Sequence, residues 1–126
     1  MRPSLALSIG AVFGILLGVP LVLAPAQVFS ALGVAMPAEG LVPARDVGVL
    51  LAGVGIIDWL ARDAVGAPLR GLLWGNIFIR AVEMVVNVWE LAAGLILTTM
   101  GGASLAATLG LNVALIVMFA LALRRA

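Results

Sequence analysis

The sequence predicts an all-α membrane protein, a bundle of four transmembrane helices that run up and down, antiparallel to one another. Of its 126 residues, 64% are hydrophobic and 10% are charged, and the mean hydropathy is +1.28. About 25% of the residues in a soluble domain are charged, so this composition excludes a soluble protein. A membrane-spanning helix needs about 20 apolar residues, which gives residues 1–126 room for four spans in a single membrane domain.

Two residue types are missing from the chain, cysteine and histidine. Their absence excludes disulfides and thiol chemistry, and it removes the usual ligands of zinc and haem as well as the commonest general base. We therefore expect no metal and no cofactor. The net charge is only +1, and no basic stripe interleaved with aromatic residues is present, so we expect no nucleic-acid partner.

Four apolar segments are predicted to span the membrane, at about residues 5–23, 44–60, 71–97 and 103–123. Pro20 is expected to break the first helix, and Pro43 to stand just before the second. The long connection at residues 27–43 is apolar enough to lie at the membrane interface as a short helix. Residues 98–104 are expected to form an uncharged hairpin turn.

Small residues predict close helix packing. The glycines concerned are Gly10, Gly14 and Gly18 on the first span, Gly48 and Gly55 on the second, and Gly110 on the fourth. The first span also precedes an A-x-A-like sequence at residues 24–26, which is typical of a signal-peptidase site. Its apolar region is longer than the 7–15 residues of a signal-peptide core, so we favour an uncleaved span over a cleaved signal peptide.

The arginines predict the orientation of the chain. Five of them share one side of a four-span topology: Arg2, Arg62, Arg70, Arg124 and Arg125. The other side has only Arg45. Because basic residues are enriched in cytoplasmic loops, we expect both termini to be cytoplasmic.

A polar stripe on the third span is the feature around which the other helices are expected to be arranged: Asn76, Arg80, Glu83, Asn87 and Glu90. Steps of four and three residues place these side chains on one face of a helix. Charged groups at membrane depth are costly unless they face protein or water. The polar stripe is therefore predicted to point into the bundle.

The second span is expected to lie against this stripe, because a short turn joins the two helices. Three pairs of polar residues would then lie at similar depth: Arg45 with Glu90, Asp58 with Arg80, and Arg62 with Asn76. Glu83 would lie opposite Gly55. Its candidate partners are Arg80 and Asn112. A polar network that fixes helix register is the simplest interpretation of this arrangement.

Three motifs resemble a pattern found in small four-helix integral membrane proteins of bacteria, a group of unknown function: Arg45-x-x-Gly48-x-Leu50-Leu51-x-Gly53, Trp59-Leu60-Ala61-Arg62 and Leu69-Arg70-Gly71-Leu72-Leu73-x-Gly75. The resemblance implies a multipass protein of the bacterial cytoplasmic (inner) membrane. It transfers no catalytic residue.

Three functions are compatible with these residues. The leading hypothesis is an accessory or packing protein of a membrane complex, with a membrane-protein partner or a second copy of the chain in the lipid bilayer. A second is an enzyme acting on a lipid-soluble substrate, with Glu83 as the candidate catalytic acid. That enzyme needs a cavity opened by Gly48, Gly55 and Gly110. The third is proton- or ion-coupled transport through Glu83 and Asp58.

Overall fold

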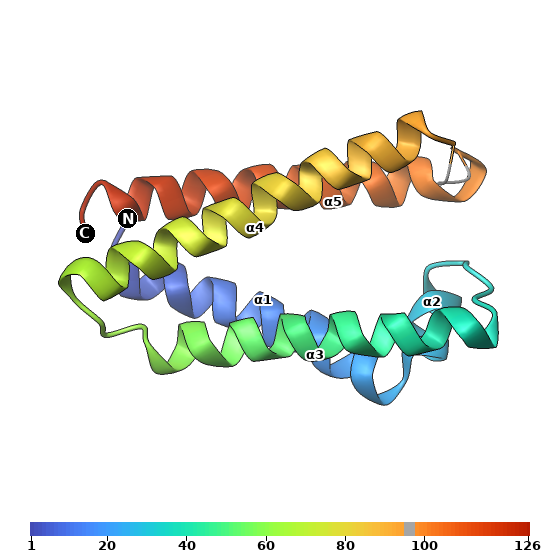
Figure 1. Cartoon of the computed structure of the whole chain (residues 1–126), viewed down its shortest axis with the longest axis horizontal. Coiled ribbons are helices and arrows are strands. Elements are labelled where there is room, and N and C mark those ends of the chain that lie inside the picture. Colours follow the sequence, from blue (N-terminus) through green and yellow to red (C-terminus); the bar gives the residue numbers. More distant parts are fainter. Residues whose placement is uncertain (95–97) are drawn as a thin grey trace. The chain divides into compact units, whose positions relative to one another are not determined.

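The computed structural model describes residues 1–94 and 98–126, and side chains outside residues 95–105. This part of the chain forms five helices: α1 (Pro3–Leu23), α2 (Pro25–Ala31), α3 (Ala38–Leu60), α4 (Gly66–Ala92) and α5 (Thr98–Leu123) (Figure 1). By length and composition, α1, α3, α4 and the Ala106–Leu123 part of α5 are able to cross a membrane. The prediction of an all-α chain with four apolar helices of spanning length is confirmed.

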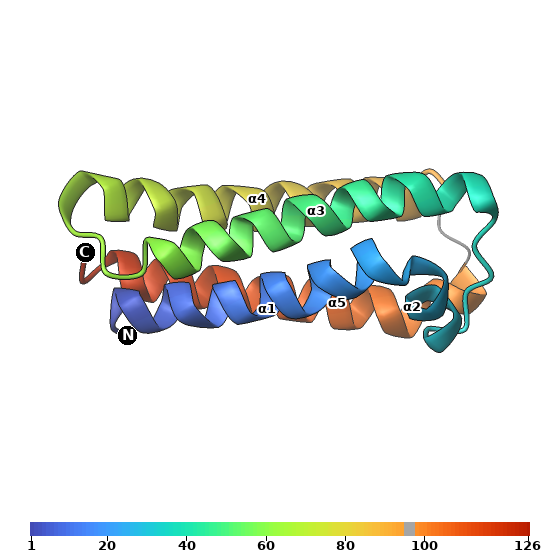
Figure 2. The same ribbon diagram turned by 90° about the horizontal axis from the view of Figure 1, so that it is seen from below.

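The chain comprises two compact units. The first, Leu7–Asp63, contains most of α1 together with α2 and α3. The second consists of Met1–Ala6 and Ala64–Ala126, and in it α4 and α5 pack side by side (Figures 1 and 2). Both units are built from long helices. The position of most side chains is therefore set by the helix face on which they lie, not by loops.

Helix α1 ends at Leu23, as predicted, but prolines expected outside two of the helices lie inside them. Helix α1 continues through Pro20 to Leu23, and α3 begins at Ala38, so that it includes Pro43. A proline has no backbone N–H and removes one helical hydrogen bond. Both prolines lie within six residues of a helix end, so most of each helix keeps its hydrogen bonds. The predicted short helix in the connection is α2, with Pro25 at its first position.

The last connection also lies at different residues from those predicted. Helix α4 begins at Gly66 and ends at Ala92, and α5 begins at Thr98, so the expected turn at residues 98–104 is wrong. Gly94 follows the end of α4 with a φ of +70°, the left-handed conformation that commonly terminates helices. Glycine adopts it without the steric penalty that a Cβ atom imposes.

Helices α1 and α3 approach each other backbone to backbone at four glycines, which we call the glycine seam: Gly14 and Gly18 on α1, and Gly48 and Gly55 on α3. A Cβ atom added at Gly55 would lie 2.8 Å from the carbonyl oxygen of Ala11. One added at Gly18 would lie 2.6 Å from the carbonyl oxygen of Gly48. The contacts run in opposite sequence order along the two helices, from Gly14 beside Gly55 to Gly18 beside Gly48.

The position of Gly55 opposite Glu83 stays a prediction, because the two residues belong to different units. Within the first unit, the backbone of α1 covers Gly55. The physical reason is that both α1 and α3 carry small residues at matching intervals. Two such faces gain the most van der Waals contact by packing on each other.

We expect Gly55→Ala to destabilise the protein by about 1–3 kcal/mol, the usual cost of overpacking, because its Cβ would meet the backbone of α1. Gly53→Ala is the matched control. On the same helix, a Cβ at Gly53 has no described atom within 4 Å, so the better helix propensity of alanine should leave stability unchanged or raise it slightly. Thermal unfolding in one detergent, followed by circular dichroism, compares the two variants. Equal midpoints would contradict the close packing of α1 on α3.

Candidate functional site

The polar stripe of α4 faces the protein, and the apolar side chains of the helix face outward. Asn76 is 5% exposed and Arg80 is 8% exposed, and the remaining three residues of the stripe are half-buried. The large apolar side chains between them are exposed, namely Phe78, Val82, Val85, Val86, Val88 and Trp89. This is the reverse of an amphipathic helix in water. It suits a helix whose surroundings are lipid.

The buried face of α4 continues beyond the stripe toward the start of the helix through Leu69 and Leu73. Helix α5 packs beside α4, and its own buried face includes Asn112, Leu115 and Phe119. Residues three or four positions apart share a helix face, so a single rotation of each helix buries these apolar side chains together with the polar ones. The second unit therefore combines an apolar core with buried polar groups.

An ion pair lies at the centre of the polar stripe. Arg80 Nη1 donates a hydrogen bond to Glu83 Oε2 at 3.1 Å, one helical turn away. The Arg80 side chain is 10% exposed, whereas that of Glu83 is 39% exposed. Of the two partners predicted for Glu83, the structure brings Arg80 to it.

Two buried donors of the second unit have no hydrogen-bond partner among the described residues, Arg80 Nε on α4 and Asn112 Nδ2 on α5. Asn76 differs, because its Nδ2 donates to the carbonyl oxygen of Leu72 at 3.1 Å and so closes back on its own helix. The Arg80–Glu83 pair therefore keeps one unused donor, Arg80 Nε, for an acceptor group. Within the described part of the chain, no cluster of acidic side chains is able to hold a metal ion.

The residues predicted to join the second and third spans lie in different units. Asp58 is buried on α3, while Arg45 is exposed on the same helix. The pairs Arg45 with Glu90, Asp58 with Arg80, and Arg62 with Asn76 stay predictions.

Arg62 has partners close to it in sequence. Its Nη1 donates to the carbonyl oxygen of Trp59 at 2.7 Å, its guanidinium lies 4.4 Å from the centroid of the Trp59 ring, and its Nε lies 3.7 Å from Asp63 Oδ2. The sequence prediction treated Arg62 as a topology signal and a partner of Asn76, and overlooked its two contacts with Trp59. The three-residue spacing of Trp59 and Arg62 was the available signal, since it places both side chains on one helix face.

Gly110 also differs from its expected role in helix packing. It is exposed, and a Cβ added there has no atom of the described residues within 4 Å. Asn112 is only 2% exposed. Residues two positions apart in a helix, such as Gly110 and Asn112, point in directions about 200° apart around the helix axis. The rotation that buries Asn112 therefore turns Gly110 outward.

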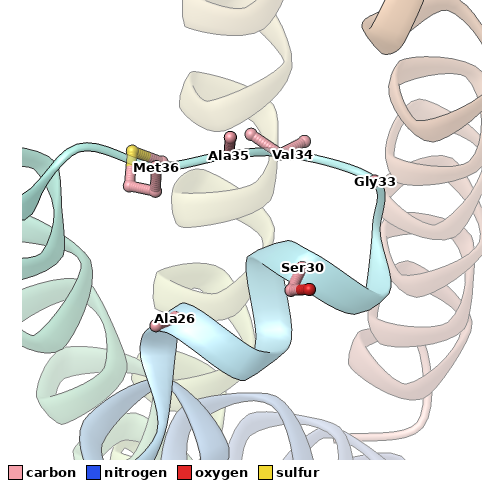
Figure 3. Close-up of a pocket in the computed structure, with 6 residues that line it drawn as sticks. All are labelled: Ala26, Ser30, Gly33, Val34, Ala35 and Met36. Carbon is pink, nitrogen blue, oxygen red and sulfur yellow. The ribbon is translucent and has the colours of Figure 1, made fainter.

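Two open pockets are lined by residues of the first unit. One, of about 460 Å³, lies where the segment 33–36 passes over α2 (Figure 3) and is lined by Ala26, Ser30, Gly33, Val34, Ala35 and Met36. The other, of about 270 Å³, is lined by Val12, Ile15, Leu16 and Trp59. Neither of these two linings includes an ionisable side chain, and only the smaller pocket is lined almost entirely by apolar atoms.

We expect Glu83→Gln to lower the free energy of unfolding by about 1 kcal/mol, because it removes the carboxylate that pairs with the buried Arg80 while the exposure of Glu83 limits the loss. The double variant Arg80→Met/Glu83→Gln should recover part of this loss, since no buried charge is left unpaired. Glu39→Gln, at an exposed position, is the control and should shift stability by less than about 0.5 kcal/mol. Denaturant unfolding in mixed micelles measures all three, and a double variant less stable than Glu83→Gln would count against the pair.

Comparisons of the chain with protein-family models, curated proteins and solved structures find no match. The resemblance to small four-helix membrane proteins of bacteria stays a prediction.

Proposed function

We propose that the protein is an accessory subunit of a membrane complex in the bacterial cytoplasmic membrane. Its four long helices form an antiparallel up-and-down bundle with both termini in the cytoplasm. A partner protein, or a second copy of the chain, covers the part of the polar stripe that the chain leaves half-buried. The observation that carries this proposal is the 39% exposure of the Glu83 side chain within a helix of spanning length.

The position of Glu83 along α4 makes this exposure costly. Helix α4 has 27 residues and is about 40 Å long, whereas the hydrocarbon core is about 30 Å thick. Glu83 lies nine residues before the end of the helix at Ala92, or about 13 Å from it. A helix centred in the bilayer therefore holds this carboxyl inside the hydrocarbon, where a charged side chain costs about 2.5–3.5 kcal/mol. Cover from a partner removes that cost.

The glycine seam also favours a packing role over catalysis. The enzyme hypothesis needs Gly48 and Gly55 to open a cavity, but the backbone of α1 occupies the space beside both. Close backbone contact is a means of holding two helices together. The glycines of the seam in the first unit therefore serve helix packing.

A second candidate function is proton-coupled transport, favoured by the half-exposed carboxyl of Glu83 beside the Arg80 guanidinium. Ionisable side chains within membrane helices mark proton pathways in pumps and transporters. Flux measurements in proteoliposomes with an internal pH dye test this function. Glu83→Gln should abolish a proton flux that Glu39→Gln retains.

For the accessory function, we expect the protein to travel with a discrete partner or a second copy of itself. Extraction in mild detergent or nanodiscs, followed by native mass spectrometry, measures what remains bound. Glu83→Gln should weaken that association, because the half-buried carboxyl is part of the covered surface, whereas Glu39→Gln should not. A fully stable lone monomer in both preparations would refute the accessory role.

The chain has no cysteine, so single introduced cysteines report its topology without background. We expect Glu39→Cys to react with a membrane-impermeant maleimide in intact cells, because Glu39 is in the first turn of α3, at the end of the helix that lies outside in the proposed orientation. Asp63→Cys should react only after the membrane is opened, since it lies on the arginine-rich side. The opposite labelling pattern would overturn the proposed orientation.

A further inference from the structure

An apolar groove on the first unit ends beside a positive charge. The groove, of about 270 Å³, is lined by Val12, Ile15 and Leu16 of α1 and by Trp59 of α3. The Trp59 ring also carries the Arg62 guanidinium, 4.4 Å from its centroid. One indole is therefore both a wall of the groove and the platform for the cation. We propose that this groove binds an acyl chain of an anionic phospholipid whose phosphate is held by Arg62.

The glycine seam accounts for the apolar part of this site. Because Gly55 has no side chain, Ile15 packs directly against it, with Ile15 Cγ1 3.1 Å from the position of a Cβ. Trp59 follows Gly55 by one helical turn and lies on the same face of α3. Leu16 is 66% exposed and Trp59 is 44% exposed, so the groove opens outward, where a lipid chain reaches it without crossing the protein.

Arg62 supplies the polar part of the site. Its Nη1 is anchored to the carbonyl oxygen of Trp59 at 2.7 Å, which holds the guanidinium in place over the ring. A guanidinium has five N–H donors in a planar fork that matches a phosphate group. The contact between Arg62 and Asp63 is a long one, 3.7 Å, and the Asp63 side chain is 80% exposed. Such an exposed pair is weak and leaves the positive charge available.

The order of these groups along α3 matches the order of groups in a phospholipid. Arg62 and Asp63 follow the end of the helix at Leu60, the level at which charged and tryptophan side chains meet lipid headgroups. The groove lies toward the interior of the helix from that level. A lipid with an apolar chain and an anionic headgroup fits both the groove and the Arg62 guanidinium. A zwitterionic lipid would instead place a second cation near Arg62.

Tryptophan fluorescence tests this proposal. In a variant that retains only Trp59 (Trp74→Phe/Trp89→Phe), brominated phosphatidylglycerol should quench the emission at about a fivefold lower mole fraction than brominated phosphatidylcholine with the same chains. That factor corresponds to the attraction of one arginine to an anionic lipid. Adding Arg62→Gln should make the two lipids equal, while adding Arg125→Gln should preserve the preference.

The variant that retains only Trp89 (Trp59→Phe/Trp74→Phe) is the matched control, since Trp89 is an exposed residue of α4 and should show no preference. Equal quenching of Trp59 by the two lipids would overturn the proposal, and so would a preference that survives Arg62→Gln. Native mass spectrometry of the unaltered chain in equimolar phosphatidylglycerol and phosphatidylethanolamine checks the site without substitutions. Retention of both lipids in equal amounts would also overturn it.

Discussion

The free-energy cost of a charged side chain in hydrocarbon governs the arrangement of α4. The ion pair between Arg80 and Glu83, which lie one helical turn apart, is surrounded along the helix by exposed valines and aromatic residues. The helix avoids the cost only in a rotation that turns its polar side chains toward the protein. That rotation also determines which side chains meet α5, and so the apolar core of the second unit follows from where the charges must lie.

The first unit depends on a different interaction. Apolar side chains gain little by leaving lipid for protein, because both surroundings are apolar. Helices α1 and α3 instead gain from close contact between their backbones at the glycine seam. The chain therefore joins one unit held by dispersion contacts at small residues to another arranged around buried polar groups. Each unit relies on an interaction that does not require water.

Hydropathy was sufficient to locate the four long helices, and the spacing of Asn76, Arg80 and Glu83 was sufficient to predict an inward polar face. The partner of each face was harder to predict. The register argument compared only neighbours in sequence, so it did not pair Gly55 with the small residues of α1 that form the seam. Gly110 illustrates a second difficulty: small residues on a membrane helix are equally acceptable outside, so their presence alone does not identify a contact.

Helix boundaries were predicted less well than helix faces. Pro20 was expected to break the first helix and Pro43 to stand just before the second, yet a proline near a helix end costs only one hydrogen bond, and the surrounding apolar residues favour continuing the helix. The glycine seam has a consequence for divergence among related chains. Because main-chain atoms make its contacts, the bulky residues around it are free to exchange among valine, leucine and isoleucine. Related chains would then keep the spacing of small residues along α1 and α3 after the sequence identity at the intervening positions had been lost.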